Sequence, residues 1–185
     1  YLNNAADCPL PAPVAQAMVS FIEDAHSFGC INFEKWLETM ERARGRFARL
    51  INCKAQEIAF VKNTTQGLII AAEAIPLCRG DLIVVNDLEF PSNLHPWNVV
   101  AKKRGARVKT IRSRVGRITP EMVAQAINRQ VKVVALSAVQ YENGFFADLE
   151  AIGDLCAKND IYFVVDAIQA CGVMPVDVER WQASI

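Results

Sequence analysis

The sequence predicts an α/β fold, an open three-layer sandwich in which helices cover both faces of a mostly parallel sheet. In its second half, apolar runs of strand length alternate with helical segments of roughly ten residues, which is typical of βαβ units. The most apolar run, residues 161–165, has the pattern of a strand that is buried on both faces. The chain has 185 residues, 52% of them hydrophobic, which is enough to enclose a substantial core.

The first part of the chain predicts an arm followed by helices. Prolines at positions 9, 11 and 13 indicate an extended segment, so we expect an N-terminal arm over residues 1–13. Residues 14–185 are then expected to form one large domain. Apolar spacing and polar helix starts predict helices over residues 14–25, 33–50 and 63–74. A short apolar run predicts a strand over residues 58–61.

The second part predicts the sheet. Its expected strands are residues 82–85, 107–111, 131–136 and 161–165. Its expected helices are residues 93–103, 120–128 and 148–159, and the second of these begins with a proline at the favoured first position. In open parallel sheets, ligands bind outside the carboxyl ends of the strands. The informative residues are therefore those that directly follow strands.

Composition and motifs argue against several classes of function. The 20 basic and 20 acidic residues give no net charge that would attract nucleic acid or an anionic membrane, and no apolar run is long enough to span a bilayer. The glycine-rich patterns of NAD-binding and P-loop proteins do not occur. The six cysteines and two histidines lack the spacing of a metal site, so no metal is expected. We interpret the cysteines as reduced thiols of a cytoplasmic protein.

Three segments that follow strands could carry chemistry. Thr64 and Thr65 open a predicted helix, whose free N–H groups and hydroxyls could hold a phosphate, although plain helix capping explains the same residues. Asp166 ends the most apolar strand, and a carboxylate buried there needs a cationic partner such as a protonated pyridine nitrogen. Gln169 could lie on the same side of that ring. The alternative is that Asp166 only caps the turn that follows the strand. Phe90 could stack on a flat ring or belong to the core.

Taken together, these segments resemble the class V group of fold-type I pyridoxal phosphate (PLP) enzymes. That group includes cysteine desulfurases, selenocysteine lyases, kynureninases and isopenicillin N epimerase-like proteins. The similarity extends through five stretches in the family's order: residues 1–6, residues 63–67, residues 89–93 with 96–97, residues 139–144 with 148–149, and residues 165–170. The resemblance implies the large domain of a PLP-dependent transferase-like fold.

The resemblance also implies roles for residues. Thr64 and Thr65 would hold the phosphate of PLP, and Phe90 would lie over its pyridine ring. Asp166 would pair with the ring nitrogen, and Gln169 would contact the ring oxygen. These five are the expected cofactor-binding residues.

Further implied positions concern the substrate and the reaction. Asn4 and Ala5 would lie near the amino-acid substrate. Cysteine desulfurases usually carry a histidine where this chain has Phe90, and a phenylalanine can stack but cannot transfer a proton. Tyr141 stands where desulfurases place an asparagine, so its contact with the ring oxygen is left open.

The function that this resemblance implies is a PLP-dependent enzyme that acts on an amino acid through a Schiff base, as a homodimer. It does not separate transamination, desulfuration, lyase and epimerase outcomes. The family's Schiff-base lysine has no counterpart in this chain, and Tyr1 is not an initiator methionine, so we expect the chain to be incomplete. The alternative is a non-catalytic relative that lacks the lysine and binds PLP or a protein partner.

Overall fold

The computed structural model describes Asn4 and residues 8–185, which fall into two compact units. The first unit comprises the described residues up to Arg49 together with Lys54–Ile58. The second comprises Leu50–Cys53 and Ala59–Ile185. Among the described residues, no helix has the length and apolar character needed to cross a membrane.

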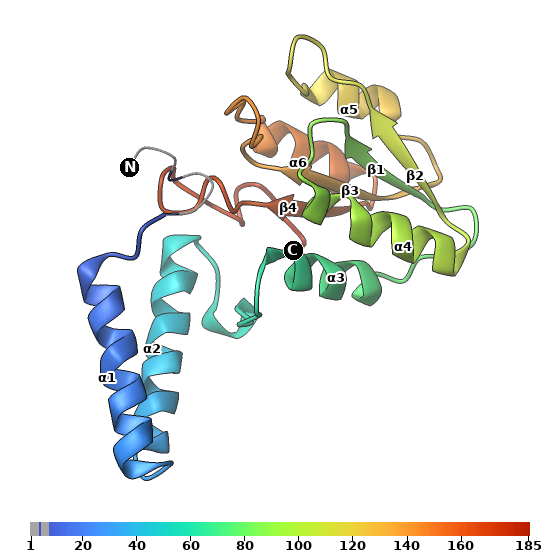
Figure 1. Ribbon diagram of the computed structural model, residues 1–185. Helices are drawn as coiled ribbons and strands as arrows, with labels where there is room; N and C mark the ends of the chain where they lie inside the picture. The colour runs from blue at the N-terminus through green and yellow to red at the C-terminus, as the bar shows by residue number, and fades with distance from the viewer. Residues whose placement is uncertain (1–3, 5–7) are drawn as a thin grey trace. The chain divides into compact units, whose positions relative to one another are not determined.

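The first unit is built on a pair of helices, α1 (Ala12–Phe28) and α2 (Phe33–Leu50), followed by the short helix η1 (Ala55–Glu57) (Figure 1). The carboxylate of Asp24 on α1 accepts hydrogen bonds from Asn32 Nδ2 at 2.7 Å and from Trp36 Nε1 at 2.9 Å. These bonds fix the turn between the two helices. Both predicted helices are confirmed, but α1 begins earlier than expected because a proline is tolerated in the first helical turn.

The second unit contains the sheet. Its strands are β1 (Leu82–Asn86), β2 (Arg107–Ile111), β3 (Val131–Ser137) and β4 (Tyr162–Asp166). They lie in the order β2-β1-β3-β4, and all neighbouring pairs are parallel. The predicted parallel α/β fold is therefore confirmed. Beside β4, Ser184 N donates to Phe163 O at 2.8 Å and Val165 N donates to Ile185 O at 3.0 Å.

Helices cover both faces of this sheet (Figure 1). The helices α3 (Thr64–Ala74) and α4 (His95–Arg104) share one apolar cluster with the side chains of Ile83 and Val85. The helices α5 (Pro120–Ala126) and α6 (Leu149–Lys158) share the other cluster with Leu82 and Val84. Because side chains alternate along a strand, β1 supplies both layers of the core, and the three-layer arrangement follows.

One predicted element is wrong, and another is confirmed with a later start. Residues 58–61 form no strand in the described part of the chain. The backbone of Ile58 is extended, but its carbonyl accepts a hydrogen bond from the Arg44 guanidinium. The helix predicted over residues 93–103 begins only at His95. It follows a separate short helix, η2 (Pro91–Asn93), and the backbone of Leu94 leaves the helical region between them, with φ −123°.

Candidate functional site

The strand order places one pair of loops at a special point of the sheet. From β1 the chain passes through α4 to β2, and from β2 it crosses back through α5 to β3 on the other side of β1. The connections that leave β1 and β3 therefore diverge, and it is at such a point, outside the carboxyl ends of the strands, that open α/β sheets form their ligand crevice. The loop after β1 carries Glu89 and Phe90, and the loop after β3 carries Gln140 and Tyr141.

Two aromatic side chains from these loops meet across the crevice. The rings of Phe90 and Tyr141 are edge to face, with centroids 5.1 Å apart and an interplanar angle of 86°. Phe90 is 49% exposed, so it is not a core residue. A ring that is braced on its neighbour and exposed on its own surface can receive another flat ring.

Asp166 is a buried carboxylate at the end of β4. Its side chain is 5% exposed, and Oδ1 accepts a hydrogen bond from Ile168 N at 3.0 Å. Burial raises the pKa of Asp166; the hydrogen bond from Ile168 lowers it, and the negative charge of Glu89 raises it further. No lysine, arginine or histidine of the described residues forms an ion pair with this carboxylate. The position can therefore accept a cationic group from a ligand.

The first turn of α3 presents unpaired donors. Asn63 is its cap, since Asn63 Oδ1 accepts from Gln66 N at 2.9 Å and Asn63 O accepts from Gly67 N at 3.1 Å. Neither the Thr64 N–H nor the Thr65 N–H has an acceptor within the described part of the chain. Asn63 alone thus accounts for the capping, which leaves two N–H groups and two hydroxyls able to bind an anion.

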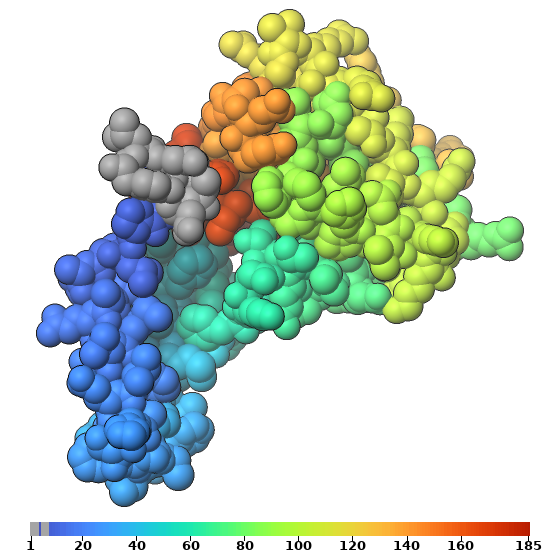
Figure 2. All heavy atoms as spheres, viewed as in Figure 1, coloured from blue at the N-terminus to red at the C-terminus, as the bar shows by residue number. Residues whose placement is uncertain are grey.

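The helix α3 and the side chain of Asp166 belong to the same face of the sheet. Val164 packs in the cluster that contains α3 and α4, and Asp166 follows it by two residues along β4, so both side chains point to that face. The helix α3 also packs beside η2, which follows Phe90. In Figure 2, α3 is teal and α4 is green to yellow-green on the side turned toward the viewer.

A hydrogen-bond network around Glu89 was not predicted. The Glu89 carboxylate is 7% exposed and accepts from five donors on four residues. The donors are Asn86 Nδ2, Asn93 Nδ2, Ser137 N, Ser137 Oγ and Gln140 Nε2. Some partners are 48 and 51 residues away in sequence, so the pairing could not be inferred from local pattern. The signal that was available is an acid between two asparagines directly after a buried strand.

The remaining predicted site residues are placed as follows. Gln169 lies half-buried in the turn after β4. Asn4 is an exposed turn residue of the first unit, and Ala5 lies outside the described residues. Asp166, Phe90, Tyr141 and the start of α3 are all in the second unit, while the predicted roles of Gln169, Asn4 and Ala5 stay predictions.

Comparison with known proteins assigns the family. The family model for aminotransferase class-V matches residues 1–185. The chain belongs to the aminotransferase class-V family. This class-V chain is 31% identical over 193 residues to a probable cysteine desulfurase of Pyrococcus abyssi, and the match covers 99% of this chain and 47% of that protein. It is 28% identical over 183 residues to a probable cysteine desulfurase of Methanothermobacter thermautotrophicus. That match covers 96% of this chain and 46% of the relative.

Solved structures agree with this assignment. The apo cysteine desulfurase of Thermococcus onnurineus superposes with a TM-score of 0.85 at 28% identity, covering 99% of this class-V chain and 47% of that protein. A C-DES variant with glycine covalently linked to its PLP cofactor superposes at 0.81 with 19% identity, covering 91% and 46%, which shows the fold alone. The chain thus spans about half the length of the relatives that it matches. Class V aminotransferases and cysteine desulfurases use PLP.

Proposed function

We propose that this chain is the cofactor-binding part of a PLP-dependent enzyme that acts on an amino acid through a Schiff base. The observation that supports the proposal most strongly is Asp166, a buried carboxylate at the end of β4 with no cationic partner among the described residues. A protonated pyridine nitrogen is a cation of the required kind. When bound, PLP supplies an electron sink for chemistry at the α-carbon of an amino acid.

The residues present fit each part of this cofactor. The open N–H and hydroxyl groups of Thr64 and Thr65 suit a phosphate, since anions are stabilised at a helix N-terminus. The exposed face of Phe90 suits the flat ring. Gln169, in the turn after Asp166, is proposed to contact the ring oxygen, and Asn4 and Ala5 to approach the substrate.

The role of Asp166 follows from its charge and burial. An ionised Asp166 stabilises a proton on the ring nitrogen because little water is present to screen the pair. Phe90 can hold the ring by stacking but has no group that could move a proton. The reaction class therefore depends on a proton-transfer group other than Phe90, and we leave desulfuration, transamination, lyase and epimerase chemistry as open outcomes.

Calorimetric titration with pyridoxamine phosphate tests the proposal. This ligand keeps the ring and the phosphate but needs no lysine. Wild-type protein is expected to bind it at least tenfold more tightly than pyridoxamine, which lacks the phosphate, because charge-assisted hydrogen bonds contribute about 1.5–3 kcal/mol each. Thr64→Val with Thr65→Val should remove most of this preference. Equal binding of both ligands by the wild type would contradict the phosphate site.

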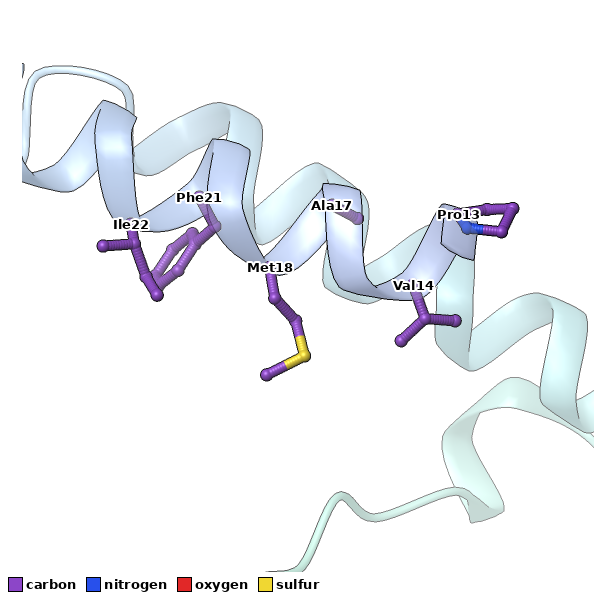
Figure 3. Close-up of a pocket in the computed structure, with 6 residues that line it drawn as sticks. All are labelled: Pro13, Val14, Ala17, Met18, Phe21 and Ile22. Carbon is purple, nitrogen blue, oxygen red and sulfur yellow. The ribbon is translucent and has the colours of Figure 1, made fainter. Parts of the chain in front are cut away.

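We further propose a homodimer in the cytoplasm. The homodimer is supported by an apolar stripe on α1, where Val14, Met18, Phe21 and Ile22 are all exposed and lie on the same side of the helix (Figure 3). The cytoplasmic location is supported by the absence of a disulfide among the described cysteines. Sedimentation velocity should give twice the chain mass of 20.5 kDa. A monomer at micromolar concentration would contradict the dimer.

A further inference from the structure

Glu89 joins the two loops of the crevice. Its carboxylate, in the loop after β1, accepts from Ser137 N at 2.8 Å at the end of β3 and from Gln140 Nε2 at 3.2 Å in the loop beyond. It also accepts from Asn93 Nδ2 at 2.8 Å in η2. The residue next to Glu89 is Phe90, so this anchor fixes the backbone from which the exposed ring projects.

The surrounding hydrogen bonds require Glu89 to be an acceptor. Asn93 Oδ1 accepts from Trp97 Nε1 at 3.1 Å, and Asn86 Oδ1 accepts from Leu88 N at 2.8 Å. Both amides must therefore turn their NH₂ groups toward Glu89. Ser137 N adds a backbone N–H to these donors, so Glu89 acts as the acceptor toward the two amides and this backbone group.

The carboxylate of Glu89 lies close to β4, the strand that ends in Asp166. Ser137, which donates to Glu89 through both N and Oγ, is paired with Asp166 in the register of β3 and β4. Neighbouring strands of a sheet lie about 5 Å apart. Within the described part of the chain, neither carboxylate has an ion-pair partner. The raised pKa of Asp166 includes a repulsive contribution from Glu89, which agrees with this proximity.

We propose that Glu89 is a positioning residue of the cofactor site, which fixes the loop of Phe90 and adds its negative charge to that of Asp166 in holding a cationic ring. This inference rests on the proposed PLP function. Like charges in a buried site are costly unless a cation joins them. The two carboxylates therefore favour a ligand with a protonated ring nitrogen over a neutral ring of the same shape.

A ligand comparison separates charge from shape. The affinity for pyridoxamine phosphate is measured alongside that for its 1-deaza analogue, in which a C–H group replaces the ring nitrogen. The wild type should prefer the nitrogen-containing ligand, and Glu89→Gln should reduce this preference about tenfold. A purely structural role predicts that both affinities fall by the same factor, so an unchanged preference in folded Glu89→Gln would overturn the proposal.

A second variant keeps the proposal testable if Glu89→Gln does not fold. Gln140→Lys should place an ammonium against Glu89 Oε1, where the Gln140 amide now donates, and so cancel the charge while the acceptor stays in place. The preference for the ring nitrogen should fall as it does in Glu89→Gln, and an unchanged preference would contradict the inference. If wild-type protein binds neither ligand, the proposed function itself fails. If it binds both equally, the charge argument fails while cofactor binding stands.

Discussion

The rings of Phe90 and Tyr141 meet edge to face, 5.1 Å apart, although the two residues belong to loops that leave the sheet in opposite directions. Because the ring of Tyr141 braces Phe90, the exposed face of Phe90 has a fixed orientation before any ligand binds. A ligand ring that stacks there loses less free energy to ordering the loop.

The contact with Tyr141 should matter more than its hydroxyl. Tyr141→Ala is expected to weaken binding of pyridoxamine phosphate by about 2- to 10-fold, since an aromatic pair contributes about 0.5–1.5 kcal/mol. Tyr141→Phe should bind as the wild type does, because it keeps the ring that packs against Phe90. A Tyr141→Phe variant as weak as Tyr141→Ala would instead assign the hydroxyl a direct contact with the ligand.

Asp166 should lower the stability of the ligand-free protein at neutral pH. Burial raises the pKa of Asp166 in the folded state, so the cost of ionising it develops as pH rises from about 4, the unfolded value, through the folded-state pKa. Asp166→Asn should therefore raise the free energy of unfolding at pH 7, and the gain should vanish as pH approaches 4. Urea denaturation across this pH range measures the effect.

Glu121 provides a control in which the pKa shift, and therefore the effect on stability, has the opposite sign. It is exposed on α5, and a hydrogen bond with Thr119 lowers the pKa of its carboxyl. Its small contribution to stability is present above the unfolded pKa and is lost as pH falls. Glu121→Gln should therefore weaken the protein slightly at pH 7, and a gain from both variants would show that the pH effect is not specific to Asp166.

Much of the fold could be predicted because its elements have strong local signals. The bounds of β2 match the predicted residues 107–111, and those of α2 match residues 33–50, since apolar periodicity continues along each whole element. The position of Asp166 at a strand end followed from the same pattern. The strand order and the Glu89 network could not be predicted, because both depend on contacts between segments far apart in sequence.

Cys156 should resist alkylation. Its side chain is 1% exposed in α6, and burial raises the pKa of its thiol to about 12, so almost no thiolate forms at pH 8. Cys8, Cys30 and Cys78 are exposed and should react with iodoacetamide. Peptide mass spectrometry after a short exposure distinguishes these sites. Rapid labelling of Cys156 in folded protein would contradict the packing of α6.

Gly153 should tolerate no side chain. An added Cβ would overlap the backbone carbonyl oxygen of Trp181, where the C-terminal segment packs on α6. Gly153→Ala is therefore expected to lower the free energy of unfolding by about 1–3 kcal/mol or more, as other overpacking substitutions do. Gly45→Ala on α2 is the matched control. An added Cβ there would meet only the flexible Arg49 side chain, at 4.0 Å, so Gly45→Ala should stabilise the protein by about 0.4–1 kcal/mol.

The affinity of Asp166→Asn for pyridoxamine phosphate tests the central claim most directly. Asparagine keeps the oxygen that accepts from Ile168 N but removes the charge that a protonated ring nitrogen requires. The account predicts binding that is about 10- to 100-fold weaker than in the wild type by calorimetry, with the preference for phosphate over pyridoxamine retained. Wild-type affinity in a folded Asp166→Asn variant would contradict the assignment of Asp166 as the partner of the ring nitrogen.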